Sequence, residues 1–210
     1  MDCIVDFEGS ENTPEMDWVV DFEGKLGEME TSKVAEDWKK QSIYKVYACT
    51  QGRNPKAYVP QAVAFGPYHH NEKQLKMQMD AHKHRALHHF LNKSRKPLKT
   101  YVTAMQSVVP ELMACYNIPD ANWKQDPYFL QLMLLDGCFM LEILRANKAI
   151  NKPRVAYGDY DGDADPIFSY HGKVYVMPYI RRDMLMLENQ LPMQLLEKLV
   201  TIEAIIQVRR

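Results

Sequence analysis

The sequence lacks the features that mark a secreted, disulfide-bonded or membrane-spanning chain. Its four cysteines are scattered without Cys-x-x-Cys spacing, and the acidic start of the chain is unlike a signal peptide. The cysteines therefore predict reduced thiols in a reducing compartment. The longest apolar stretch, residues 130–146, is interrupted by Gln131, Asp136, Glu142 and Arg145. A charge at hydrocarbon depth costs at least about 2.5 kcal/mol, so we expect no membrane span in this chain.

Motifs for catalysis and for phosphate or nucleic-acid binding are also missing. The sequence has no Gly-x-Ser-x-Gly elbow and no glycine-rich phosphate loop. Its lysines and arginines are dispersed and do not alternate with aromatic residues, which argues against a nucleic-acid partner. We expect no catalytic residues and no cofactor. What remains is 46% hydrophobic and 25% charged residues over 210 positions, a composition typical of one globular domain with or without an arm.

Charge divides the chain into two unequal parts. Residues 1–37 hold twelve acidic residues against Lys25 and Lys33, a net charge of −10, whereas the whole chain carries only −1. Such an arm is either a solvated tail or an internal lid against a basic patch, and we favour the tail. We therefore predict a partly helical acidic arm over 1–37 and a helical domain over 38–210.

Hydrophobic periodicity predicts a mainly α fold. A short β element is expected at Gly172–Met177, and Pro110 should kink or split the helix that contains it. Helix starts are indicated at Asp126, which precedes Pro127, and at Pro192. We expect a helix over residues 14–29 in the arm. The domain should be an irregular helical domain, incomplete at its C-terminal end, with helices over residues 73–91, 98–116, from 126, 179–190 and 192–206.

The helix that begins at Asp126 is apolar nearly all round and should be the central helix of the core. Asp136 falls on its middle apolar face, whereas Glu142, Arg145 and Cys138 fall on the opposite side, where we expect solvent. A buried carboxylate needs a partner or must be neutral. We therefore predict that Asp136 is buried and pairs with a basic side chain, which is one of Arg181, Arg182, His69 or His70.

The C-terminal helix carries an apolar stripe with no later element to cover it. Leu195, Leu199, Ile202 and Ile206 lie along this stripe. Burying each such side chain is worth about 1.5–3 kcal/mol, so an uncovered stripe is costly. We expect the chain to self-associate unless this helix folds back onto the core.

Metal binding is the first chemistry that the histidines and aspartates suggest. His84 and His88 share one helical face but have no visible third ligand. Alternating aspartates from Asp159 to Asp165 resemble part of a calcium loop. The loop fails because its sixth and twelfth positions are Ala164 and Tyr170 where glycine and glutamate are required. We predict no metal site, and we expect Asp165, which precedes Pro166, to cap or turn the chain.

An ordered set of motifs carries a family resemblance. The chain resembles the N-terminal half of a plant-specific family known as domain of unknown function 247. The resemblance rests on segments at 43–46, 57–61, 82–83 and 165–168 and on Phe65-Gly-Pro-Tyr-His-His70, Leu135-Asp-Gly-Cys-Phe-Met-Leu-Glu142 and Arg182-Asp-Met-Leu-Met-Leu-Glu-Asn-Gln-Leu-Pro192.

The resemblance implies a recognition or signalling role, because some relatives are linked to grass self-incompatibility and the family has no established enzymatic activity. Family members usually end in a hydrophobic membrane anchor. We therefore expect a non-enzymatic recognition or scaffolding module of a membrane-associated signalling protein, cytoplasmic or membrane-peripheral as this chain, with an unidentified protein partner. The alternative is a hydrolase-like or metal-dependent enzyme that uses His69 or His70 with Asp136 or Glu188. The motif residues that we expect to be structural are Tyr68, His69, His70, Asp136, Asp165, Arg182, Asp183, Glu188, Asn189 and Gln190.

Overall fold

The computed structural model describes residues 17–28, 36, 38–117, 126–148, 160 and 165–204. Its backbone contacts divide the chain into two units, Met1–Lys40 and Gln41–Arg210. The first unit contains helix α1 (Asp17–Glu28), on which the aromatic rings of Trp18 and Phe22 lie 6.4 Å apart. The helices of the second unit are α3 (Ala48–Gln51), the 3-10 helix η1 (Pro55–Ala57), α4 (Lys73–Ser94), α5 (Leu98–Gln106), α6 (Val109–Ala114), α7 (Asp126–Lys148), α8 (Tyr170–Tyr175), α9 (Met177–Met184) and α10 (Met193–Ala204).

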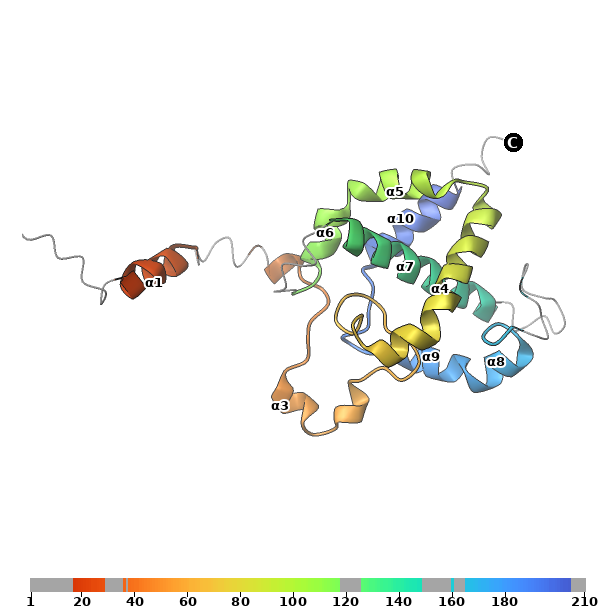
Figure 1. Ribbon diagram of the computed structural model, residues 1–210, viewed down its shortest axis with the longest axis horizontal. Coiled ribbons are helices and arrows are strands. Elements are labelled where there is room, and N and C mark those ends of the chain that lie inside the picture. Colours follow the sequence, from red (N-terminus) through yellow and green to blue (C-terminus); the bar gives the residue numbers. More distant parts are fainter. Residues whose placement is uncertain are drawn as a thin grey trace, which may run out of the picture. The chain divides into compact units, whose positions relative to one another are not determined.

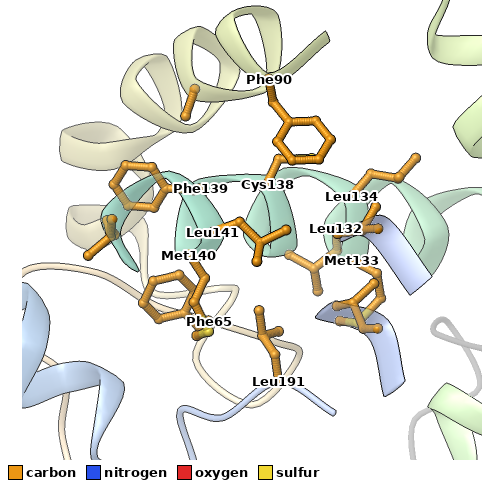
Figure 2. Packing of buried hydrophobic residues seen from close by; sticks show 14 of the residues in the cluster. Phe65, Phe90, Leu132, Met133, Leu134, Cys138, Phe139, Met140, Leu141 and Leu191 are labelled. Atoms are coloured by element: carbon orange, nitrogen blue, oxygen red, sulfur yellow. The ribbon is translucent and has the colours of Figure 1, made fainter. Parts of the chain in front are cut away.

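Helix α7 is the centre of the second unit, as its apolar sequence predicts. It contacts α4, α5, α6 and α10 (Figure 1). Phe90 of α4 lies on one side of α7, and Phe65 and Leu191 lie on the other (Figure 2). Helix α7 begins at Asp126, as expected from a residue that can cap a helix before a proline.

Proline divides the predicted 98–116 helix in two. Helix α5 ends at Gln106, and α6 begins at Val109 with Pro110 in its first turn. Proline is tolerated there because the first amides of a helix have no partner within it. The prediction of a split at Pro110 is confirmed.

The predicted β element at Gly172–Met177 is wrong. These residues lie in α8 and α9, and the Ser169 side chain caps α8 by accepting the Gly172 N–H at 3.1 Å. The segment contains β-branched and aromatic residues, which favour strands, but six residues are too short to form a sheet by themselves. Within the described residues, the isolated bridge between Ile43 and Tyr116 is the one β-type pairing. The predicted 179–190 helix also ends early, at Met184, and a turn-rich segment follows.

The apolar stripe of the C-terminal helix is covered. Leu195, Leu199 and Ile202 are buried because α10 packs against α7 and α5. We expected the chain to self-associate unless this helix folds back onto the core. The described part of the stripe does fold back, so the condition for self-association is not met there. Ile206 lies outside the described residues.

Close packing of α10 on α7 depends on Gly137. A Cβ atom at this position would lie 2.6 Å from Leu199 Cδ1 and 3.3 Å from Leu195 Cδ2. We expect Gly137→Val to lower the free energy of unfolding by about 1–3 kcal/mol, because the added methyl groups overpack a buried contact. Urea unfolding would measure this loss. Met77→Val, at an exposed position of α4, should change stability far less, and equal effects of the two would contradict the packing argument.

Candidate functional site

The Asp183 carboxylate holds the backbone of the segment that precedes the Phe65–His70 motif. Its Oδ2 atom accepts the N–H groups of Gln61, Ala62 and Val63 at 2.9, 2.6 and 3.0 Å. Asp183 lies near the end of α9 and is fully buried. Hydrogen bonds to a charged acceptor are stronger than neutral ones, so this contact fixes residues 61–63 against α9.

Asn189 continues these contacts to Phe65, two residues beyond Val63. Its Oδ1 atom accepts the Phe65 N–H at 2.7 Å, and its Nδ2 group donates to the Val63 and Asp183 carbonyls, both at 3.0 Å. The neighbouring Gln190 side chain donates to the carbonyls of Met184 and Met186. The 182–190 motif therefore folds on itself and holds the 61–65 segment by hydrogen bonds to its main chain. We call these contacts the 183–189 clamp.

Asp136 of α7 is buried, as the sequence predicts, but its bonded cation is Lys83 of α4. Lys83 Nζ lies 2.5 Å from Asp136 Oδ1 and also donates to the Ala64 carbonyl at 2.6 Å. The Gly66 N–H donates to Asp136 Oδ2 at 2.8 Å. Burial raises the pKa of Asp136, and the Lys83 ammonium opposes that rise.

The prediction of an arginine at Asp136 is therefore wrong. Arg182 instead donates to the Lys56 carbonyl at 2.8 Å. His70 interacts with Asp136 electrostatically, and His69 pairs with a different carboxylate. Helix periodicity is the signal that could have found Lys83, because this residue falls between Met79 and Ala86 on the buried stripe of α4. The sequence analysis had no reason to prefer it to the arginines of the 182–192 motif.

Glu188 is, after Asp183, the second buried carboxylate of the 182–192 motif. It accepts the Val46 N–H at 2.5 Å and the Gln51 amide at 2.9 Å, and its Oε2 atom lies 3.3 Å from His69 Nε2. Tyr68 ties the same region together, since its hydroxyl donates to the Ile43 carbonyl and accepts the Asn117 N–H. Two of the candidate catalytic side chains, His69 and Glu188, are thus brought together.

Asp165 turns the chain as predicted. Its Oδ1 atom accepts the N–H groups of Ile167 and Phe168 at 2.8 and 2.7 Å. Its Oδ2 atom lies 2.8 Å from Arg85 of α4, so the turn is also tied to that helix. The other aspartates of the expected acidic loop lie outside the described residues.

The expected solvent side of α7 is buried, which corrects the sequence analysis. Glu142 lies 2.7 Å from His89 Nδ1 and 2.8 Å from Arg145, which also contacts Glu203 of α10. Helices α4 and α10 cover this side of α7, and the polar side chains pair with one another there. Burial also raises the pKa of the Cys138 thiol far above its usual range, so this cysteine is packed as a neutral thiol.

The described residues contain no group of three or more histidine, cysteine, aspartate or glutamate side chains that could hold a metal ion. His84 Nδ1 donates to the Asp80 carbonyl at 2.8 Å, and His88 contacts Asn92. These two histidines therefore form local contacts on α4.

Stability should fall as the pH drops below about 6.5 because of His69 and His70. Burial lowers the pKa of each below the ordinary value of 6.5, although Glu188 raises that of His69. The unfolded chain therefore binds more protons, so the stability contribution is complete above pH 6.5 and is lost as the pH falls through the folded-state pKa. Urea unfolding at several pH values would measure this slope, and His69→Gln should reduce it. An unchanged slope in His69→Gln would contradict the assignment to His69.

Comparisons with known proteins identify the family of this chain. The profile of the DUF247 family, described as plant protein of unknown function, matches residues 43–209. A relative named UPF0481 protein At3g47200, from Arabidopsis thaliana, is 32% identical over 160 residues, which are 75% of this chain and 30% of the relative. The chain thus spans less than a third of that relative's length. No solved structure matches the chain. The matched range contains the 183–189 clamp, the Lys83–Asp136 pair and the His69–Glu188 pair, and the chain belongs to the plant family DUF247.

Proposed function

We propose that this chain is a non-enzymatic recognition or scaffolding module of a membrane-associated signalling protein. The observation that carries the proposal is a concentration of exposed apolar side chains between residues 170 and 193. We call these side chains, which are near one another along the chain, the 170–193 surface: Tyr170, Val174, Tyr175, Tyr179, Leu185, Leu187 and Met193, each between 45% and 82% exposed.

The composition of the 170–193 surface suits protein recognition. Single exposed apolar residues are normal on any protein, but seven within 24 positions are a concentration. Tyrosine is enriched at interfaces because it buries a large area at a small cost in side-chain entropy. Lys173 and Arg182 lie in the same segment, and its Asp183 and Glu188 are buried, which favours a partner with acidic groups.

The use of the buried carboxylates supports a non-enzymatic role. Asp136 and Asp183 bind backbone amides, and Glu188 binds one amide and two side chains. These contacts hold separate segments of the chain together, which is a structural use of acidic groups. The membrane part of the proposal rests on the family resemblance. Within the described residues, no helix has the length and apolar character needed to cross a bilayer.

A site-specific photo-crosslinker in the full chain, expressed in plant cells, would test the recognition role. Placed at Tyr179, it should capture one discrete protein, and Leu187→Ala in the same chain should reduce the capture. Placed at Met77, which is also exposed but lies on α4, it should not capture that protein. Identical products from both positions, or no product from either, would contradict the proposal.

The His69–Glu188 pair favours one alternative, a hydrolase-like or metal-dependent enzyme. A carboxylate beside an imidazole is an arrangement that general-base catalysis uses. Turnover of ester or amide substrates by the purified chain, with and without divalent metal, would support this alternative if Glu188→Gln abolished the turnover and left the melting temperature unchanged.

A further inference from the structure

A cavity of about 580 Å³ lies among α4, α5, α6 and α7. Its volume falls within the roughly 300–1,000 Å³ that is typical of small-molecule sites. Each of the four helices contributes an aliphatic side chain to the wall, as Leu87, Val102, Val109 and Leu134 illustrate. The cavity therefore lies within the second unit, and none of its lining residues belongs to the 170–193 surface.

The walls of this cavity select an aliphatic ligand. The described residues that line it include seven leucines and valines and one proline, but no phenylalanine, tyrosine or tryptophan. An aromatic ligand would lack the stacking partners that aromatic-lined sites provide. An alkyl chain or a saturated ring system instead makes dispersion contacts with leucine and valine and loses contact with water.

Hydrogen-bond donors mark the polar part of the lining. His84, Gln106 and Gln131 are exposed side chains from α4, α5 and α7 that also line the cavity. His84 Nδ1 donates to the Asp80 carbonyl at 2.8 Å, so Nε2 of the neutral ring is an acceptor. The described lining contains no aspartate or glutamate, so an anionic head group would meet the amide donors of Gln106 and Gln131 without a facing carboxylate.

We propose that this cavity binds a lipophilic carboxylic acid. The aliphatic body lies between α4, α5 and α7, and the carboxylate lies at the exposed edge, where it accepts hydrogen bonds from the side-chain amides of Gln131 or Gln106. This assignment is independent of the recognition role, because it uses different residues on different helices.

Fluorescence titration of the full chain with cis-parinaric acid, a linear polyene fatty acid without an aromatic ring, tests the site. We expect saturable binding of one probe per chain, displaced by dodecanoic acid at least about tenfold more effectively than by dodecan-1-ol. The alcohol has the same alkyl length but no charge. Binding that does not saturate, or equal displacement by acid and alcohol, would overturn the proposal.

Two pairs of variants localise the bound probe. Val102→Trp fills the cavity from α5 and should weaken binding at least about tenfold, whereas Thr103→Trp, at the exposed next position, should not. Gln131→Glu places a negative charge at the edge and should weaken displacement by dodecanoic acid but not by dodecan-1-ol. Its control is Gln78→Glu, at an exposed position of α4 that does not line the cavity.

The exposed variants guard against misfolding as the cause of lost binding. Gln131 is on the surface, so Gln131→Glu should keep the parent melting temperature even if Val102→Trp does not. Equal affinities in Val102→Trp and Thr103→Trp, or equal loss of acid and alcohol binding in Gln131→Glu, would overturn the assignment to this cavity.

Discussion

Asp183→Ala should lower the free energy of unfolding by about 4 kcal/mol or more, because three N–H groups, two of them buried, lose a charged acceptor together. Each hydrogen bond to a charged group contributes about 1.5–3 kcal/mol, and a buried donor left without a partner costs a further desolvation penalty. A domain is typically stable by only about 5–15 kcal/mol. The variant should therefore be largely unfolded at moderate urea concentration, where the parent is still native.

Two control variants test whether the loss of stability comes from the hydrogen bonds that Asp183 accepts. Asp183→Asn keeps one carbonyl oxygen and should lose less stability than Asp183→Ala. Asp80→Ala removes a half-exposed carboxylate from α4 and should change the free energy of unfolding by about 0.5 kcal/mol at most. The urea midpoint and slope of each variant, followed by circular dichroism, provide the comparison. If Asp183→Ala unfolds at the parent midpoint, the 183–189 clamp does not stabilise the fold.

Asp136→Ala should be the second severe variant, with a loss of about 3–5 kcal/mol. Removal of the carboxylate leaves the Lys83 ammonium in the core with only the Ala64 carbonyl, and it also removes the acceptor of the Gly66 N–H. Gly66 has a positive φ of 68°, and the hydrogen bond helps to hold the chain in that conformation. The expected loss of stability therefore has two sources, the unpaired Lys83 ammonium and the weaker restraint on the backbone at Gly66.

A double-mutant cycle tests the pair directly. Lys83→Met alone leaves the Asp136 carboxylate without its cation and should also be strongly destabilising. The double variant Lys83→Met/Asp136→Ala removes both charges and should be less destabilised than the sum of the single variants. Strict additivity in urea unfolding would show that the Lys83–Asp136 contact contributes no coupling energy.

Local sequence signals determined the helices of this protein. Pro110 divides α5 from α6, Asp126 with Pro127 starts α7, and the period of apolar residues gives α4 to within a few residues of its end. Each of these signals acts within one or two turns of the chain, so no knowledge of distant segments is needed. Where the local pattern was ambiguous, at 172–177, the strand prediction failed because these residues lie in helices, the first of which is capped by the Ser169 side chain.

Burial of Asp136 also followed from sequence, because this residue falls on the middle apolar face of the central helix, opposite the side that was expected to face solvent. The identity of the residue that pairs with Asp136 did not follow from the sequence. Lys83 and Arg182 are both basic residues in resemblance motifs, and only the packing of α4 on α7 brings one of them to Asp136. Glu142 was expected to face solvent for the same reason, since its helix pattern does not indicate that α4 and α10 cover that side of α7.

The sequence alone thus determined the mainly helical fold, the resemblance to the family and the burial of Asp136. These depend on local periodicity and on residue types in order along the chain. Only the tertiary structure decided which groups meet. The amides held by Asp183 lie 120–122 positions away, and His89 lies 53 positions from Glu142. A helix pattern indicates which face is apolar, but not which distant helix covers it. Partner choice is set by long-range packing, where desolvation requires each buried charge to meet whichever opposite charge or hydrogen-bond donor the fold brings within reach.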